Sequence, residues 1–127
     1  MTNRGKLLAM NATSIAAAAR LQDLRALLGD AGLLTASADT DAFAVDQRRL
    51  YHGRPLAVAL PSTVDEVATI VRWCGEHHVG LVPQGGNTSY CGGATPDESG
   101  RQLVIGLRRL NRIRTLDAAN FSMTVEA

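Results

Sequence analysis

The chain has 127 residues, 46% of them hydrophobic and 20% charged, with a formal net charge of +1, which fits one small globular domain with its own core. The near-neutral charge favours neither nucleic acid nor an acidic partner, and no apolar run approaches the ~18 residues that a membrane span requires. The two cysteines, Cys74 and Cys91, lack the C-x-x-C spacing of a redox or zinc pair, so we expect a reduced, cytoplasmic setting, with a single disulfide as the alternative.

The first 38 residues are predicted to be a loosely ordered tail followed by one helix, separate from a domain that spans residues 39–127. The helical period starts at Ser14, and Gly29 or Gly32 can end the helix. Its leucines recur at intervals of three and four residues, which places them on one face. These residues are Leu21, Leu24 and Leu28.

Two segments lead to the first strand of the larger domain. A short helix is expected around residues 41–45, with Asp39 or Thr40 as its cap. The polar residues 46–54 are expected to form an exposed connection. The apolar run Leu56–Leu60, which ends at a proline, is then typical of a short buried strand.

A helix should follow this strand. Ser62 or Thr63 can begin it with a capping box, in which a carboxylate three residues later reaches back to a free N–H, and it should end near Gly80. Its predicted buried stripe contains Val64, Val67, Val71, Cys74 and His78. Because Leu81 and Val82 form the next strand, the strand, helix and strand together make a βαβ unit with parallel strands.

Three further strands are expected, over residues 103–105, 113–117 and 122–126, and the last two should be half-buried and antiparallel. The predicted fold class is therefore α/β (α+β), a small parallel βαβ sheet with flanking helices followed by antiparallel strands. Because the final strand stops at Ala127 in mid-pattern, which leaves an unprotected edge, we expect a truncated chain that is incomplete at its C-terminus.

Four glycines fall within nine residues directly after the second strand, in the segment Gly85–Gly93. Glycine permits left-handed turns, and such a loop can direct several N–H groups at an anion. A P-loop is excluded because the sole lysine is Lys6, and the dinucleotide fingerprint is excluded because no two glycines are spaced as G-x-G. We therefore expect a nucleotide phosphate bound by backbone amides and by the hydroxyls of Thr88 and Ser89 rather than by a cation.

The run Pro83–Ser89, followed by Gly92 and Gly93, resembles the pyrophosphate loop of the FAD-linked oxidoreductases related to vanillyl-alcohol oxidase, which share a PCMH-type FAD-binding domain. Within that superfamily the chain is most similar to the branch of D-2-hydroxyacid and D-2-hydroxyglutarate dehydrogenases and glycolate oxidase subunits. The resemblance covers about residues 39–127. It extends to the flanking runs Arg48–Arg54, Pro61–Val67 and Leu110–Ile113.

The resemblance implies FAD as the cofactor, with its pyrophosphate on the loop. The implied cofactor-binding residues are Pro83, Gln84, Gly85, Gly86, Asn87, Thr88, Ser89, Tyr90, Gly92 and Gly93. Some relatives attach the flavin through a histidine directly after the glycine pair. Because Asn87 stands there and cannot form that bond, non-covalent FAD is expected. The family's substrate-binding and metal-binding residues belong to a later cap domain, so we expect no catalytic and no metal-binding residue in this chain, and His77 and His78 should bind carbonyls at a helix end.

The implied function is the FAD-binding portion of a flavin-dependent dehydrogenase that oxidises a 2-hydroxy acid, uses an unidentified electron acceptor and is inactive as an isolated chain. Two alternatives remain. One is a fragment similar to the flavoprotein that reduces UDP-N-acetylenolpyruvoylglucosamine, and the other is a non-enzymatic nucleotide- or anion-binding module. Five arginines crowd residues 101–114, but few aromatics are available to stack bases, which favours a solvated edge over nucleic-acid binding.

Overall fold

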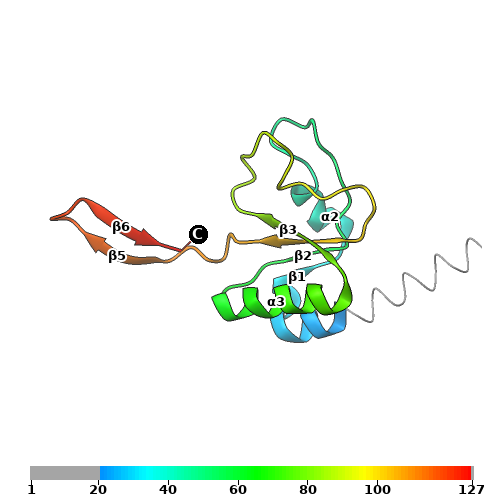
Figure 1. Cartoon of the computed structure of the whole chain (residues 1–127), viewed down its shortest axis with the longest axis horizontal. Helices are drawn as coiled ribbons and strands as arrows, with labels where there is room; N and C mark the ends of the chain where they lie inside the picture. Colours follow the sequence, from blue (N-terminus) through cyan, green and yellow to red (C-terminus); the bar gives the residue numbers. More distant parts are fainter. Residues whose placement is uncertain (1–20, 127) are drawn as a thin grey trace, which may run out of the picture.

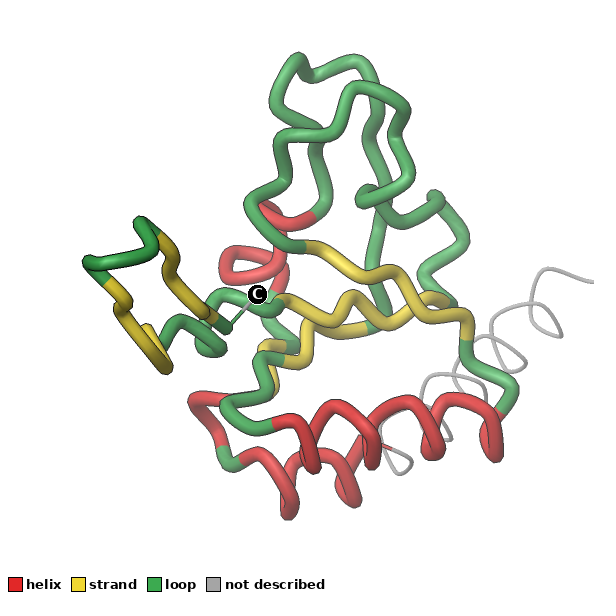
Figure 2. The backbone as a smooth tube through the Cα atoms, turned by 60° about the vertical axis from the view of Figure 1, so that its left-hand side comes forward, coloured by secondary structure: helices red, strands yellow, loops and turns green. Residues whose placement is uncertain are grey.

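The computed structural model describes residues 21–126. A four-stranded sheet forms the centre of the molecule. The helix of residues 21–28 and the long helix Val64–His77 pack on one face, and a short helix and the loops lie on the other side (Figures 1 and 2). A two-stranded hairpin projects away from this body. Within the described residues, no helix has the length and apolar character needed to cross a membrane. This mixed α/β architecture confirms the predicted fold class.

The N-terminal elements cover one edge of the sheet. Residues 21–28 are helical, and the helix ends where predicted, at Gly29, whose φ of 69° is left-handed. The predicted start of this helix at Ser14 lies outside the described residues. A 3-10 turn, η1 (Asp30–Gly32), then leads into the short strand β1 (Leu33–Leu34).

The short helix expected around residues 41–45 begins earlier than predicted. It consists of α2 (Ser37–Thr40) and the 3-10 turn η2 (Asp41–Phe43). Thr40, one of the two predicted caps, occupies the N-cap position of η2, but no side chain caps either piece, and the N-cap residue of α2 is Ala36. The Thr40 hydroxyl instead donates to the carbonyl of Ser37.

The sheet has the order β1-β2-β4-β3. Its strands β2 (Ala57–Ala59), β3 (Gly80–Gln84) and β4 (Gln102–Gly106) are parallel, while β1 is antiparallel to β2. The predicted βαβ unit therefore exists, but its two strands are not neighbours, because β4 lies between them. In register, Val58 pairs with Val104, which in turn pairs with Val82. The strand between β2 and β3 is thus β4, which comes last of the four in the sequence.

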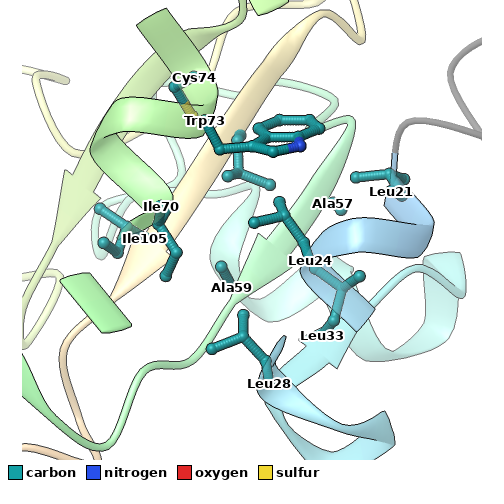
Figure 3. Close-up of a cluster of buried hydrophobic side chains, with 11 residues drawn as sticks. Leu21, Leu24, Leu28, Leu33, Ala57, Ala59, Ile70, Trp73, Cys74 and Ile105 are labelled. Carbon is teal, nitrogen blue, oxygen red and sulfur yellow. The ribbon is translucent and has the colours of Figure 1, made fainter. Parts of the chain in front are cut away.

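Both faces of the sheet are buried, which explains why β2 and β4 are continuous apolar runs. Alternate residues serve opposite faces: Ala57 and Ala59 join one cluster, and Val58 joins the other. Figure 3 shows the first cluster, in which side chains from residues 21–28 and from the long helix converge over β2. The second cluster lies on the face below the loops and contains Phe43, Val58, Leu60, Val82 and Val104.

The long helix α3 (Val64–His77) connects β2 to β3 and has both predicted ends. Thr63 is its N-cap and accepts a hydrogen bond from the N–H of Glu66, whose carboxylate accepts one from the N–H of Ser62. This is close to the predicted capping box. His78, in the left-handed region with φ 53°, ends the helix.

The predicted buried stripe of α3 is partly wrong. Val64, Val71 and His78 are exposed, whereas Ile70 (0% exposed) and Trp73 face the sheet together with Cys74. Both patterns have helical spacing. Packing decides which of the two faces of α3 turns towards the sheet. Here the face with the larger side chains packs against β2 and the helix 21–28.

The C-terminal strands β5 (Ile113–Asp117) and β6 (Ser122–Val125) are antiparallel, as predicted. They form a separate two-stranded sheet rather than joining the main one. The expected half-burial is wrong, since both faces of the hairpin are largely exposed and Phe121 at its turn is 98% exposed. Alternating polarity predicts a strand whose apolar face packs against the rest of the protein. In the hairpin, no part of residues 21–126 packs against that face.

Candidate functional site

The glycine loop leaves the carboxyl end of β3, which is the edge where ligands bind in open sheets of parallel strands. Its ten predicted residues are contiguous apart from Cys91. Pro83 and Gln84 end β3, and the other eight lie in the loop that follows. The loop runs beside the connection between η2 and β2, on the side of the sheet away from α3 (Figures 1 and 2).

Gln84 closes the base of the loop. Its side chain is only 4% exposed, and its amide Nε2 donates to the carbonyls of Phe43, at 3.0 Å, and Ala94, at 2.8 Å. Both amide hydrogens are therefore used inside the protein. The side chain of Gln84 ties the two ends of the loop together, so its contribution to a bound ligand is limited to its backbone.

Asn87 and Gly92 set the course of the loop, because they alone among residues 84–94 adopt left-handed backbone conformations, with φ of 54° and 72°. The side-chain amide of Asn87 donates to the carbonyl of Val45 at 2.8 Å. A Cβ on Gly92 would lie 2.9 Å from the ring of Tyr51. The glycines were expected to permit left-handed turns, and Gly92 provides one, but an asparagine provides the other.

The segment under the loop is organised by Asp46, which the sequence placed in an exposed connection. Asp46 is 3% exposed, and its carboxylate accepts hydrogen bonds from three backbone N–H groups, those of Arg48, Leu50 and Tyr51. These bonds, that of Tyr51 foremost, hold the pKa of Asp46 below its usual range. The expectation was wrong because an Asp can replace a carbonyl as acceptor for a tight turn.

Arg48 and Tyr51 extend from this turn to the outer part of the loop. The guanidinium of Arg48 donates to the carbonyl of Tyr90 at 2.9 Å and lies over its ring, 4.7 Å from the centroid. Tyr51 packs against Gly92. Neither residue was predicted as part of the site, although both belong to the flanking run that carries the family resemblance.

Backbone donors are available along the first half of the loop. Counting only partners within residues 21–126, the N–H groups of Gly85, Gly86, Asn87, Thr88 and Ser89 donate no hydrogen bond. Unpaired backbone donors are usual only where water or a ligand can reach them. The loop therefore offers consecutive donors to an external acceptor.

Two of the glycines are not explained by the packing of the chain itself. A Cβ on Gly85 or Gly93 would meet nothing within 4 Å, and neither residue has a left-handed φ. Gly86 is also open, with only a methyl of Thr88 at 3.9 Å. Neither turn geometry nor packing therefore requires glycine at these positions. Glycine does, however, allow a ligand to approach the backbone closely.

The hydroxyls of the loop are accessible as well. Ser89 Oγ accepts a hydrogen bond from the N–H of Cys91 at 3.3 Å, which leaves its own proton free to donate. Thr88 is exposed. Cys91 and Cys74 are both free thiols, which rules out the disulfide alternative.

A pocket of about 400 Å³ opens beside the first glycines. Its walls come from three parts of the chain: the start of the loop, the segment after β4, and the end of β6. The lining residues are Gly85, Gly86, Leu107, Arg108, Leu110, Asn111 and Glu126. The segment after β4 was predicted to belong to a solvated edge, and its residues Leu110–Ile113 carry part of the family resemblance, but nothing in its spacing indicated a contact with the glycine loop.

Two of the histidines contact backbone carbonyls. His77 Nδ1 is 2.9 Å from the carbonyl of Trp73 at the end of α3, which confirms the predicted helix-end contact for this residue. His52 Nε2 is 2.9 Å from the carbonyl of Arg49. Over the part of the chain that the structure describes, no three His, Cys, Asp or Glu side chains are grouped in a way that could hold a metal ion.

Parallel strands that end in an open glycine loop with free amides define a nucleotide-binding type of α/β domain. Residues 55–127 match the family described as FAD binding domain, and the chain belongs to that family. The match identifies FAD as the cofactor, as the sequence predicted.

The curated relatives are dehydrogenases and oxidases of 2-hydroxy acids. The chain is 39% identical over 95 residues to a D-2-hydroxyglutarate dehydrogenase of Xanthomonas citri, which covers 75% of this chain and 20% of the relative. It is 37% identical over 84 residues to glycolate oxidase subunit GlcD of Bacillus subtilis, covering 66% and 17%. The chain thus spans about a fifth of the length of these relatives.

Solved structures share the fold. An alkyldihydroxyacetonephosphate synthase superposes with a TM-score of 0.70 over 84% of this chain and 23% of that protein, at 19% identity. A p-cresol methylhydroxylase with bound substrate superposes with a TM-score of 0.65 at 29% identity, covering 77% and 19%. These neighbours agree with the predicted PCMH-type FAD-binding domain.

The residues present fit a diphosphate-containing cofactor. Free N–H groups on consecutive residues, two hydroxyls and three glycines that leave the backbone open form a donor set suited to phosphate oxygens. The placement of FAD on the individual loop residues remains a prediction.

Proposed function

We propose that the chain binds FAD non-covalently through Pro83–Tyr90, Gly92 and Gly93 and forms the FAD-binding portion of a dehydrogenase acting on a 2-hydroxy acid. The observation that carries this proposal is the row of unpaired amides from Gly85 to Ser89 beside glycines that the chain's own packing does not require. The relatives' names, D-2-hydroxyglutarate dehydrogenase and glycolate oxidase subunit, support the substrate class.

When bound, the flavin supplies the chemistry by accepting a hydride equivalent from the carbon that bears the substrate hydroxyl. The residues of this chain bind and orient. The amides of the loop hold phosphate oxygens, Gln84 fixes both ends of the loop, and the amide of Asn87 fixes its first turn against Val45. No proton transfer is assigned to this chain, and its isolated form is proposed to be inactive.

Three further proposals follow from the same family. Asn87 replaces the tethering histidine, and its side-chain amide is already engaged with Val45, which supports non-covalent attachment. Residues 39–127 are proposed to carry the FAD-binding residues, while the helix 21–28 and β1 pack into the same sheet and core. The two free thiols, one exposed and one buried, support a reducing compartment such as the cytoplasm.

Titration of the chain with FAD tests the proposal. Flavin fluorescence should change and saturate at one FAD per chain, and acid precipitation of the complex should release all of the flavin into the supernatant. The control is the same titration with the chain unfolded in urea, where no change is expected. Binding of simple anions with no response to FAD would instead favour the non-enzymatic anion-binding module, and flavin that stays with the precipitate would contradict non-covalent attachment.

A further inference from the structure

Arg108 lies next to the first glycines of the loop. The N–H of Leu107 donates to the carbonyl of Gln84 at 3.0 Å, which brings the segment after β4 against the start of the loop. Arg108 follows immediately and lines the same pocket as Gly85 and Gly86. A cationic side chain and free backbone amides therefore share one cavity.

The guanidinium of Arg108 is positioned by an aromatic ring. Its Cζ lies 5.0 Å from the centroid of Phe43, a residue of the second hydrophobic cluster that is only 8% exposed. Gly106 leaves room for this arrangement, since a Cβ there would lie 3.2 Å from Cε1 of Phe43. Stacking on a ring restrains a guanidinium while leaving its N–H groups free.

Arg108 differs from its neighbouring arginines in having no acceptor. Arg109 donates to the carbonyl of Leu60, and Arg112 and Arg114 pair with Glu126. Within residues 21–126, Arg108 forms neither a salt bridge nor a hydrogen bond. It is thus a restrained cation whose five donors are free for an external anion.

One acidic residue, Glu126, also lines the pocket, and an unpaired carboxylate there would repel an anion. Its carboxylate, however, is bound by Arg112 at 2.9 Å and by Arg114 at 3.3 Å. These two cations offset its charge, and the hydrogen bond from Arg112 lowers the pKa of Glu126 to about 2. The pocket therefore carries a net positive charge at neutral pH.

We propose that Arg108 is the cationic contact for the diphosphate of bound FAD, acting beside the amides of Gly85 and Gly86. The proposal rests on the proposed function and differs from the expectation from the sequence that the loop binds phosphate without a cation. Arginine suits this role because its planar fork can donate two parallel hydrogen bonds to a phosphate.

Three variants of the full chain test this contact. In Arg108→Gln the charge is lost, and FAD affinity should fall about tenfold or more, as expected for the loss of hydrogen bonds between charged groups. Arg108→Lys keeps the charge without the fork and should recover part of the affinity. The matched control is Arg101→Gln, because Arg101 precedes β4 and so lies at the opposite end of the parallel strands from the loop.

Two readouts distinguish a contact from a structural role. The dependence of FAD affinity on salt concentration should be shallower in Arg108→Gln than in the wild type, because one screened attraction is missing. Competition by inorganic pyrophosphate should be weaker in the same variant. The urea unfolding midpoint, followed by Trp73 fluorescence, should match that of the wild type.

The outcomes separate the contact from the wider proposal. If the wild type binds FAD and Arg108→Gln binds it equally well, or loses affinity with an unchanged salt dependence, the contact is overturned and FAD binding stands. If the wild type binds pyrophosphate through Arg108 but does not bind FAD, the flavin proposal fails and the anion contact is supported. If it binds neither, both are overturned.

Discussion

Gly85 and Gly92 belong to one loop but are glycines for different reasons. Gly92 has a left-handed φ of 72° and lies against the ring of Tyr51, so the fold itself requires a glycine there. Gly85 has open space where a side chain would stand. The sequence cannot separate the two cases, because both appear as one letter in a glycine-rich run.

This difference predicts opposite behaviour for two alanine variants. Gly92→Ala should lower the free energy of unfolding by about 1–3 kcal/mol, through its left-handed backbone and the contact with Tyr51. Gly85→Ala should leave it within about 0.5 kcal/mol of the wild type but weaken FAD binding, because the new methyl group stands where the ligand approaches. Urea unfolding and FAD titration of each variant provide the measurements. A stable Gly85→Ala with unchanged FAD affinity would remove the main support for the loop as the cofactor site.

Asp46 shows why part of the site could not be predicted. In the sequence it begins a polar run, which usually means an exposed loop. In the fold its carboxylate is the common acceptor of three N–H groups and holds the turn that presents Arg48 and Tyr51 to the glycine loop. Burial of such an acid depends on the partners that the backbone brings to it, and composition does not reveal them.

Among the elements, α3 was the most predictable, because its ends have local chemical signals. The Thr63 cap, the acidic first turn and the stop near Gly80 are all encoded within a few residues of the helix. Its buried face was less predictable, since Ile70 and Trp73 had to be chosen over Val64 and Val71 by packing against β2 and the helix 21–28. The residues at a helix end determine where the helix stops, whereas contacts with other elements determine which face of the helix is buried.

Gly75 gives a prediction for this helix. It is an exposed position in the last turn of α3 where a Cβ would meet nothing within 4 Å, so Gly75→Ala should stabilise the protein by about 0.5 kcal/mol, the lower end of the range for helix interiors. The matched control is Gly29→Ala, where a Cβ also meets nothing but φ is 69°. That variant should be destabilised instead. Thermal unfolding followed by circular dichroism measures both, and the same sign for the two variants would contradict this account.

The exposure of the hairpin and the order of the strands could not be predicted from the sequence. Residue alternation located β5 and β6 correctly, but not the exposure of both faces. Apolar runs located β2, β3 and β4, but not the position of β4 between the other two. Strand order depends on which edges meet in three dimensions, and the apolar runs of the three strands are too similar to specify it.

At the scale of the whole molecule, Asp46 and Cys74 are two of the groups with shifted pKa values, and they affect the dependence of stability on pH from opposite sides of neutrality. Hydrogen bonds from backbone N–H groups lower the pKa of Asp46, so its stabilising contribution is present above the usual carboxyl pKa and is lost as the pH falls through the lowered value. Burial raises the pKa of Cys74 to about 11. The unfolded thiol ionises first, at about pH 8.5, so stability should fall as the pH rises from there to the folded value.

We therefore predict a stability plateau between these two regions, measured as the urea unfolding midpoint across pH. Asp46→Asn should be less stable than the wild type at pH 7, and the difference should shrink below about pH 4, where the unfolded carboxyl becomes protonated. In Cys74→Ala, stability should fall less at alkaline pH than in the wild type, because no thiol ionises at this position. A gap between Asp46→Asn and the wild type that stays constant down to acid pH would show that the charge of Asp46 does not matter.

The position of β4 also has a consequence for the order in which the chain can fold during synthesis. When α3 and β3 have emerged from the ribosome, β2 and β3 have no strand between them, and the edges that will face β4 remain unpaired until residues 102–106 follow. The nascent chain must therefore hold two apolar strand edges open while the whole glycine loop is being synthesised. Such edges invite pairing with other chains, so the loop that serves the ligand also lengthens the interval in which the protein is most exposed to misassembly.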